Sequence, residues 1–191
     1  MLNWDQLQEK CMTCTQCGLC QTRNNVVFGV GPQDADILFV GEGPGEQEDI
    51  QGEPFVGPAG KLLDDMLSII DLDRSNCYIT NVVKCRPPKN RDPIDEEQIA
   101  CIHYLRNQFA LIRPKIIVCV GRIAAKRLID MDYKITREQG RWICREGIWM
   151  TSIYHPSALL RDPHKRPDAF EALISIREKL KEVHADLSSR S

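Results

Sequence analysis

Short runs of consecutive apolar residues alternate along the chain with longer stretches in which apolar residues recur every three or four positions. The short runs have the length and the β-branched content of buried strands. These predicted strands lie at 35–41, 77–83, 115–121 and, as two β-like runs, within 141–154. The longer stretches predict amphipathic helices over 58–71, 95–112, 123–129 and 168–183. Strands that alternate with helices predict an α/β fold, in which helices cover both faces of a mostly parallel sheet.

The length of the chain, 191 residues, suits one compact domain with its own hydrophobic core. We expect a single domain over 1–185, with a cysteine-rich head at 1–25, and a flexible tail at 186–191. Segment 86–93 (RPPKNRDP) contains three prolines and is predicted to be a loop. Because ligands of parallel sheets bind beyond the carboxyl ends of the strands, the loops after 40, 83 and 154 are the candidate site.

Composition and charge exclude several classes of protein. With 42% hydrophobic and 27% charged residues, the chain is not disordered throughout. A net charge of −2 excludes a polycationic surface, although local basic patches remain possible. No apolar run reaches the roughly 18–20 residues of a membrane helix. The first residues also lack the basic and apolar segments of a secretory signal. We therefore expect a cytoplasmic protein that makes no contact with membranes.

The chain has nine cysteines, which in a cytoplasmic protein indicate metal or redox chemistry rather than disulfides. Four of them recur every third residue in the polar head: Cys11, Cys14, Cys17 and Cys20. A C-x2-C pair can bind zinc or an iron–sulfur cluster, and the spacing does not separate the two. Cys85 and Cys101 lie around the proline-rich loop and would complete a set of four thiolates. The others lie in strand-like runs and are expected in the core: Cys77, Cys119 and Cys144.

A glycine-rich turn, GEGPGEQED at 41–49, follows the first predicted strand. Glycines at such a position bring the backbone close to a ligand. The turn lacks the third glycine of a dinucleotide-binding fingerprint, and its four acids would repel a pyrophosphate. The absence of a following Gly-Lys-Ser/Thr excludes a P-loop. The turn therefore suits a neutral ligand, or a reaction that develops positive charge.

Three further side chains could bind a flat, hydrogen-bonding ligand. Phe55 lies in a glycine- and proline-rich loop, where an aromatic ring can stack on a ligand or join the core. The amide of Asn81 has a donor side and an acceptor side, so it can read the edge of a base, or it can be a satisfied buried amide. His155 follows the last predicted strand and is either structural or functional.

Basic residues gather in two loops at the same edge. The first group follows the second predicted strand and the other follows His155: Lys84, Arg86, Lys89 and Arg91, then Arg161, Lys165 and Arg166. Such runs are usually solvated surfaces. Their position beside Asn81 and His155 favours contacts with the phosphates of a nucleic acid.

Four segments in this order resemble the family 4 uracil-DNA glycosylases: GEGPGEQED, PFVGPAGKLL, ITNVVKCRPPKNRDP and HPSALLR. The similarity extends from about Leu7 to the last predicted helix. The spacing of four cysteines also matches the ligands of that family's [4Fe–4S] cluster: Cys14, Cys17, Cys85 and Cys101. The resemblance implies a three-layer α/β/α fold with a central, mainly parallel four-stranded sheet.

The resemblance also implies an activity, which is excision of uracil from single- and double-stranded DNA. A monomer would hydrolyse the N-glycosidic bond of a flipped-out deoxyuridine and so begin base excision repair. Each matching residue would have a role. The backbone of Gly41, Glu42 and Gly43 would line the uracil pocket, Phe55 would stack on the base, Asn81 would read its edge, and His155 would contact uracil O2. Glu48 would lie near the reacting sugar or its water, and Glu42 could also favour a cationic sugar. Gly43 replaces the aspartate of other branches, so the general base stays open.

Two other functions are compatible with part of the sequence. The cysteine-rich head would suit an iron–sulfur redox protein, or a zinc-stapled nucleic-acid-binding module without catalysis. The redox interpretation leaves Asn81, His155 and the two basic loops unexplained. A strand-cleavage assay on a uracil-containing oligonucleotide separates the three.

Overall fold

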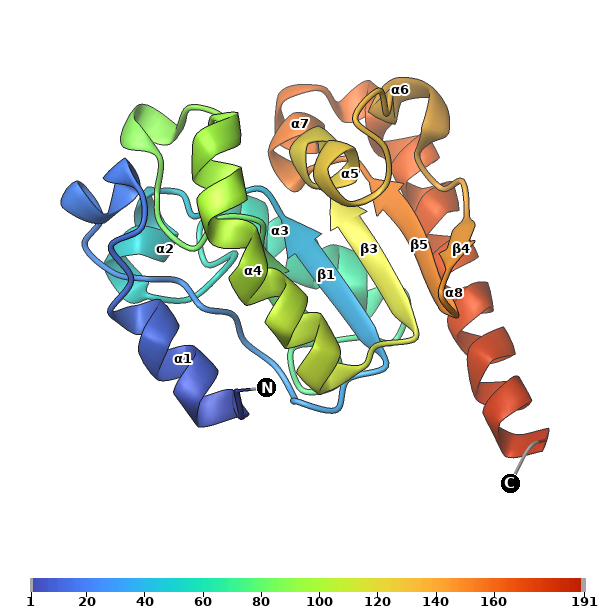
Figure 1. The fold of residues 1–191 in the computed structure, drawn as a ribbon. Coiled ribbons are helices and arrows are strands. Elements are labelled where there is room, and N and C mark those ends of the chain that lie inside the picture. The colour runs from blue at the N-terminus through green and yellow to red at the C-terminus, as the bar shows by residue number, and fades with distance from the viewer. Residues whose placement is uncertain (1, 190–191) are drawn as a thin grey trace.

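The computed structural model describes the backbone of residues 2–189 and the side chains of residues 2–185. A five-stranded sheet forms its centre, in the order β2-β1-β3-β5-β4 (Figure 1). Four strands are parallel to one another: β1 (Ile37–Gly41), β2 (Tyr78–Asn81), β3 (Ile116–Val120) and β5 (Ile148–Ile153). The predicted α/β fold with a mostly parallel sheet is confirmed.

The fifth strand is the one difference in the sheet. β4 (Ile143–Arg145) pairs antiparallel with β5 at the edge. Two residues connect these strands, Glu146 and Gly147, with φ of 51° and 81°. Positive φ at both positions is typical of the tight turns that join antiparallel strands. The two β-like runs within 141–154 therefore form a hairpin, and β4 adds a strand to the expected four.

Helices cover both faces of the sheet (Figure 1). One face packs against α1 (Trp4–Met12), α4 (Asp95–Ile112) and α5 (Arg122–Leu128). The other packs against α3 (Pro58–Ser68), α7 (Pro156–Arg161) and α8 (Arg166–Ser189). Successive residues of β1 alternate between the two cores, as the two-residue repeat of a strand requires. Shorter elements complete the chain: α2 (Glu46–Gln51), α6 (Ile135–Glu138) and the 3₁₀ turns at Gly18–Gln21, Pro88–Asn90 and Pro163–Lys165.

Some boundaries and burials differ from the sequence-based expectations. α8 continues to Ser189, whereas the apolar pattern ends near Val183, so helical backbone extends into the expected tail. Residues 190 and 191 of that tail lie outside the described residues. Cys77 and Cys119 are fully buried as expected, but Cys144 is exposed on the edge strand β4. Within the described residues, no helix is long and apolar enough to cross a membrane.

The topology brings the candidate loops together. Gly41 of β1 is in register with Asn81 of β2, and the end of β3 is in register with Ile153 of β5. The carboxyl ends of all four parallel strands therefore meet at one edge, as the sequence predicts.

Candidate active site

A cavity of about 450 Å³ lies at this edge of the sheet. Its walls come from all four segments that resemble the known family, and include Glu42, Gly43, Glu48, Phe55, Asn81, Arg91, His155 and Arg161. Its volume lies in the usual range for small-molecule sites. The fold therefore brings six of the seven predicted catalytic and base-binding residues into one cavity, all except Gly41.

Asn81 is the last residue of β2 and lines this cavity. Its side chain is almost completely buried, and its amide oxygen has no hydrogen-bond partner among the described residues. Buried polar atoms without a partner are rare in native proteins. The unpaired oxygen therefore indicates the position of a donor that a ligand would bring.

Gly41 makes the close packing of this region possible. A Cβ atom at this position would lie 2.4 Å from Asn81 Oδ1 and 2.6 Å from Phe55 Cζ. No other residue fits without moving both side chains. The glycine that precedes Glu42 in the motif thus places the amide and the aromatic ring beside the same piece of backbone.

His155 enters the cavity as the N-cap of α7. Its Nδ1 accepts a hydrogen bond of 3.2 Å from the backbone N–H of Ser157. In a neutral imidazole the proton then lies on Nε2. Desolvation, helped by the charge of Arg161, lowers the pKa of His155 to about 4. His155 is therefore a neutral N–H donor at physiological pH, and its ring centroid lies 5.6 Å from that of Phe55.

Glu42 has an acidic neighbour that the sequence analysis missed. Desolvation and the nearby carboxylate of Asp92 raise the pKa of Glu42 to about 7, although Arg122 opposes the shift. Asp92 and Arg122 form an ion pair and both line the cavity. Asp92 lies within the matched loop RPPKNRDP, and Arg122 directly follows a strand end. These two positions in the sequence could have identified Asp92 and Arg122 as candidate site residues.

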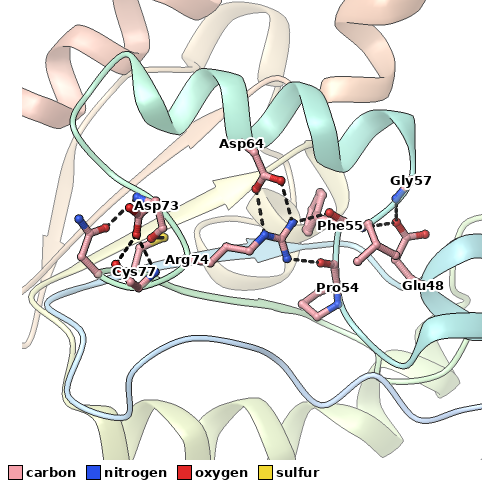
Figure 2. A network of polar contacts seen from close by, with 11 residues as sticks. Glu48, Pro54, Phe55, Gly57, Asp64, Asp73, Arg74 and Cys77 are labelled. Carbon is pink, nitrogen blue, oxygen red and sulfur yellow. Dashed lines mark hydrogen bonds and ion pairs between the residues drawn. The ribbon is translucent and has the colours of Figure 1, made fainter.

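Glu48 supports the loop that carries Phe55 (Figure 2). Its Oε1 accepts hydrogen bonds of 2.9 Å from the backbone N–H groups of Val56 and Gly57. One carboxylate oxygen is thus occupied in holding the backbone just before α3. Glu48 also lines the cavity, which is compatible with a second role near a ligand.

Lys84 was predicted to contact DNA phosphates, and this prediction is wrong. The side chain is fully buried, 1% exposed, behind the strand end. Its ammonium group donates to the backbone oxygen of Asn81 at 3.0 Å, to Gln108 Oε1 at 2.7 Å and to Thr80 Oγ1. Lys84 lies between buried residues of the β2 end, so its side chain points inward and cannot reach a phosphate.

The other predicted phosphate contacts lie on the surface around the cavity. Several are already paired with acids: Arg86 with Glu46, Arg91 with Glu97 and Lys165 with Asp162. Lys89 is exposed in the proline-rich loop, and Arg161 and Arg166 are exposed after His155. Lys89, Arg161 and Arg166 are therefore the candidates with the least competition from neighbouring carboxylates.

A second cavity lies behind the strand end and is lined by six cysteines: Cys11, Cys14, Cys17, Cys20, Cys85 and Cys101. Two sulfurs accept hydrogen bonds, Cys85 from the Arg23 guanidinium at 3.2 Å and Cys101 from the backbone N–H of Lys84 at 3.3 Å. Hydrogen-bond donors around ligand atoms are typical of metal sites. Across the part of the chain that the structure describes, no three His, Cys, Asp or Glu side chains are grouped to hold one metal ion.

Comparison with known proteins agrees with this geometry. The family model of the uracil DNA glycosylase superfamily matches residues 28–178. The chain is 47% identical to the type-4 uracil-DNA glycosylase of Archaeoglobus fulgidus, over 88% of each protein. It is 44% identical to that of Sulfurisphaera tokodaii, over 91% of this chain and 83% of the other. It is 46% identical to that of Thermotoga maritima, over 82% of each. The chain therefore belongs to the uracil DNA glycosylase superfamily and, within it, to the type-4 uracil-DNA glycosylases.

Proposed function

We propose that the protein removes uracil from DNA by hydrolysing the N-glycosidic bond of a flipped-out deoxyuridine, as the first step of base excision repair. One observation carries the proposal. A buried amide oxygen without a partner, that of Asn81, faces a cavity that also holds an aromatic ring and a neutral histidine. The names of the relatives support the same activity. We further propose that the enzyme acts as a cytoplasmic monomer on both single- and double-stranded DNA.

Recognition of uracil follows from the amide of Asn81. Its oxygen would accept a hydrogen bond from uracil N3–H, and its NH₂ group would donate to uracil O4. Phe55 would stack on the face of the base. Inside a duplex these base edges and the glycosidic bond are covered, so the nucleotide must leave the helix first.

The chemistry separates charge. When the C1′–N1 bond breaks, its electron pair stays on uracil, which becomes an anion, and the sugar becomes an oxocarbenium-like cation. His155 Nε2–H would donate to uracil O2, where negative charge grows. Carboxylates of Glu42 and Glu48 in the cavity wall would favour the cation. Water then adds to C1′, and ionised Glu42, with a pKa of about 7, can accept its proton.

The decisive experiment incubates the protein with uracil-containing oligonucleotides, single- and double-stranded, and then cleaves abasic sites with alkali. We expect strand cleavage at uracil only. A binding module would retain the DNA without cleavage, and a redox protein would do neither. Either result would contradict the proposed function.

We also propose that the cysteine cavity holds a [4Fe–4S] cluster through Cys14, Cys17, Cys85 and Cys101. Thiolates around a single zinc ion lie about 4 Å apart, given Zn–S distances of about 2.3 Å. Thiolates that bind the four irons of a cluster lie farther apart, and the proposal rests on the spacing of the four cysteines and on the cavity that they line. The buried charge of Lys84 and the guanidinium of Arg23 suit an anionic group. The cluster would join the head to the site and takes no part in the reaction.

The cluster proposal predicts the metal content of the protein. Protein purified without oxygen should be brown and contain about four irons per chain. Cys85→Ala should lose the iron and lower the melting temperature. Cys77→Ala is the matched control, because this buried thiol lies in the opposite core and donates to the backbone oxygen of Asp73 (Figure 2). Stoichiometric zinc without iron would contradict the cluster.

Phosphate binding is tested best at Lys89. Lys89→Glu should weaken DNA binding for every sequence alike, because a phosphate contact reads no base. The slope of log affinity against log salt should shrink by about 0.9 per lost contact on duplex DNA. Lys181→Glu, on the distant part of α8, is the matched control and should change neither value. An unchanged slope for Lys89→Glu would mean that this loop is only a solvated surface.

A further inference from the structure

Phe55 has a backbone conformation that its side chain disfavours. Its φ is 55°, in the left-handed region that bulky residues rarely adopt. Such conformations persist only where the surroundings hold them, and they gather at functional sites. The ring nevertheless lies in a defined place, beside Gly41 and 5.6 Å from the ring of His155. The loop around Phe55 must therefore be fixed from outside.

Two side chains hold this loop from opposite sides (Figure 2). Glu48 accepts from the backbone N–H groups that follow Phe55, as described above. Arg74, from the segment between α3 and β2, donates to the carbonyl oxygen of Pro54 at 2.8 Å and to that of Phe55. The carboxylate of Glu48 thus binds backbone donors of the loop, and the guanidinium of Arg74 binds backbone acceptors.

Arg74 is itself oriented by α3. Its Nε donates to Asp64 Oδ1 at 3.0 Å, so the guanidinium bridges the helix and the loop. The same helix packs closely on the Phe55 carbonyl: a Cβ at Gly60 would lie 1.8 Å from its oxygen, so this close approach requires glycine. A planar guanidinium can make these three contacts together, whereas a lysine ammonium cannot reproduce that fork.

We propose that Arg74 is a positioning residue for base recognition, which acts by holding Phe55 in its left-handed conformation with the ring against the uracil site. The proposal rests on the proposed function of Phe55 as the stacking residue. Arg74 lies outside the lining of the cavity and touches no base. Without it the loop can relax toward an ordinary φ, which would turn the ring away from His155.

A double-mutant cycle tests the proposal, with single-turnover excision rates and KM measured for Arg74→Gln, Phe55→Ala and the double variant. We expect Arg74→Gln to reduce kcat/KM about 10-fold or more in the wild-type background and about 2-fold or less when Phe55 is already alanine. Arg106→Gln, at an exposed position of α4, is the matched control and should be neutral. Equal losses in both backgrounds would mean a general structural role and would overturn the proposal.

Hydrogen exchange tests the role of Arg74 independently of the proposed excision of uracil. In Arg74→Gln the amides of Val56 and Gly57 should exchange faster, whether or not the protein excises uracil. Unchanged exchange would refute the clamp, whereas an inactive wild type with faster exchange in the variant would refute only the function. Arg74→Lys, which keeps the charge beside Asp64, should lie between wild type and Arg74→Gln. If Arg74→Gln does not fold, Arg74→Lys tests whether Arg74 holds the loop.

Discussion

Replacing His155 by alanine should lower the rate of uracil excision by about 100- to 1,000-fold, the usual effect of losing one donor to a developing anion. The reason is the fixed ring, whose Nδ1 is occupied by Ser157 N–H and whose proton is left on Nε2. His155→Asn provides a comparison, because asparagine also caps helices but does not place a donor at the same distance. Single-turnover rates should fall in both variants while DNA affinity stays within about 2-fold.

The same residue predicts a pH dependence. Since burial lowers the pKa of His155 to about 4, the ring stays neutral from pH 5 upward. A protonation of His155 should therefore cause no change of the excision rate near pH 6.5. The pH profiles of the wild type and of His155→Ala should have the same shape in that range. The free energy of unfolding changes with pH in the opposite direction from that of a histidine paired with an acid. As the pH falls, the ring is protonated in the unfolded chain first, because its pKa there is about 6.5. Stability from this group is complete above pH 6.5 and is lost as the pH falls toward 4. A rate step near pH 6.5 that depends on His155 would contradict a neutral donor.

Asn81→Ala should abolish most uracil excision with little change in DNA affinity. Two hydrogen bonds to the base are lost, and unpaired polar groups in a dry pocket cost about 1–3 kcal/mol each. Asn107→Ala, which removes an amide on α4 that donates to the His103 backbone, is the matched control. If Asn81→Ala removes uracil as fast as wild type, Asn81 is only a core amide and the assignment of the pocket fails.

The same amide explains the choice of base. Uracil presents the acceptor O4 beside the donor N3–H, whereas cytosine presents the donor N4–H₂ beside the acceptor N3. The orientation of Asn81 therefore mismatches cytosine at both positions. Asn81→Asp, when protonated, could donate to cytosine N3 and accept from N4–H₂. We expect a trace of cytosine excision by this variant at low pH, measured on matched oligonucleotides. Its absence at every pH would mean that other groups also read the base.

The sequence predicted the main strands, the parallel sheet and the edge where the loops meet, because apolar runs and helical periodicity are local signals. It placed Asn81 and His155 at one edge for the same reason, whereas the place of Phe55 beside them came only from the resemblance to a known family. Contacts between segments far apart in the chain could not be predicted from the sequence. Lys84 looks like part of a basic loop, and its burial and its contact with Gln108, on α4, show that it is not. The influence of Asp92 and Arg122 on Glu42 likewise joins three segments and has no local pattern.

The cysteine cavity joins parts of the chain that are far apart, and this has a thermodynamic consequence. Cys17 and Cys85 are about 68 residues apart in sequence, yet they line the same space. A metal bridge between them would close a long loop in the unfolded chain and reduce its conformational entropy. By analogy with a disulfide, a loop of this length is worth about 4 kcal/mol. For a domain whose total stability is of the order of 5–15 kcal/mol, loss of the proposed cluster would then remove a large share of that stability.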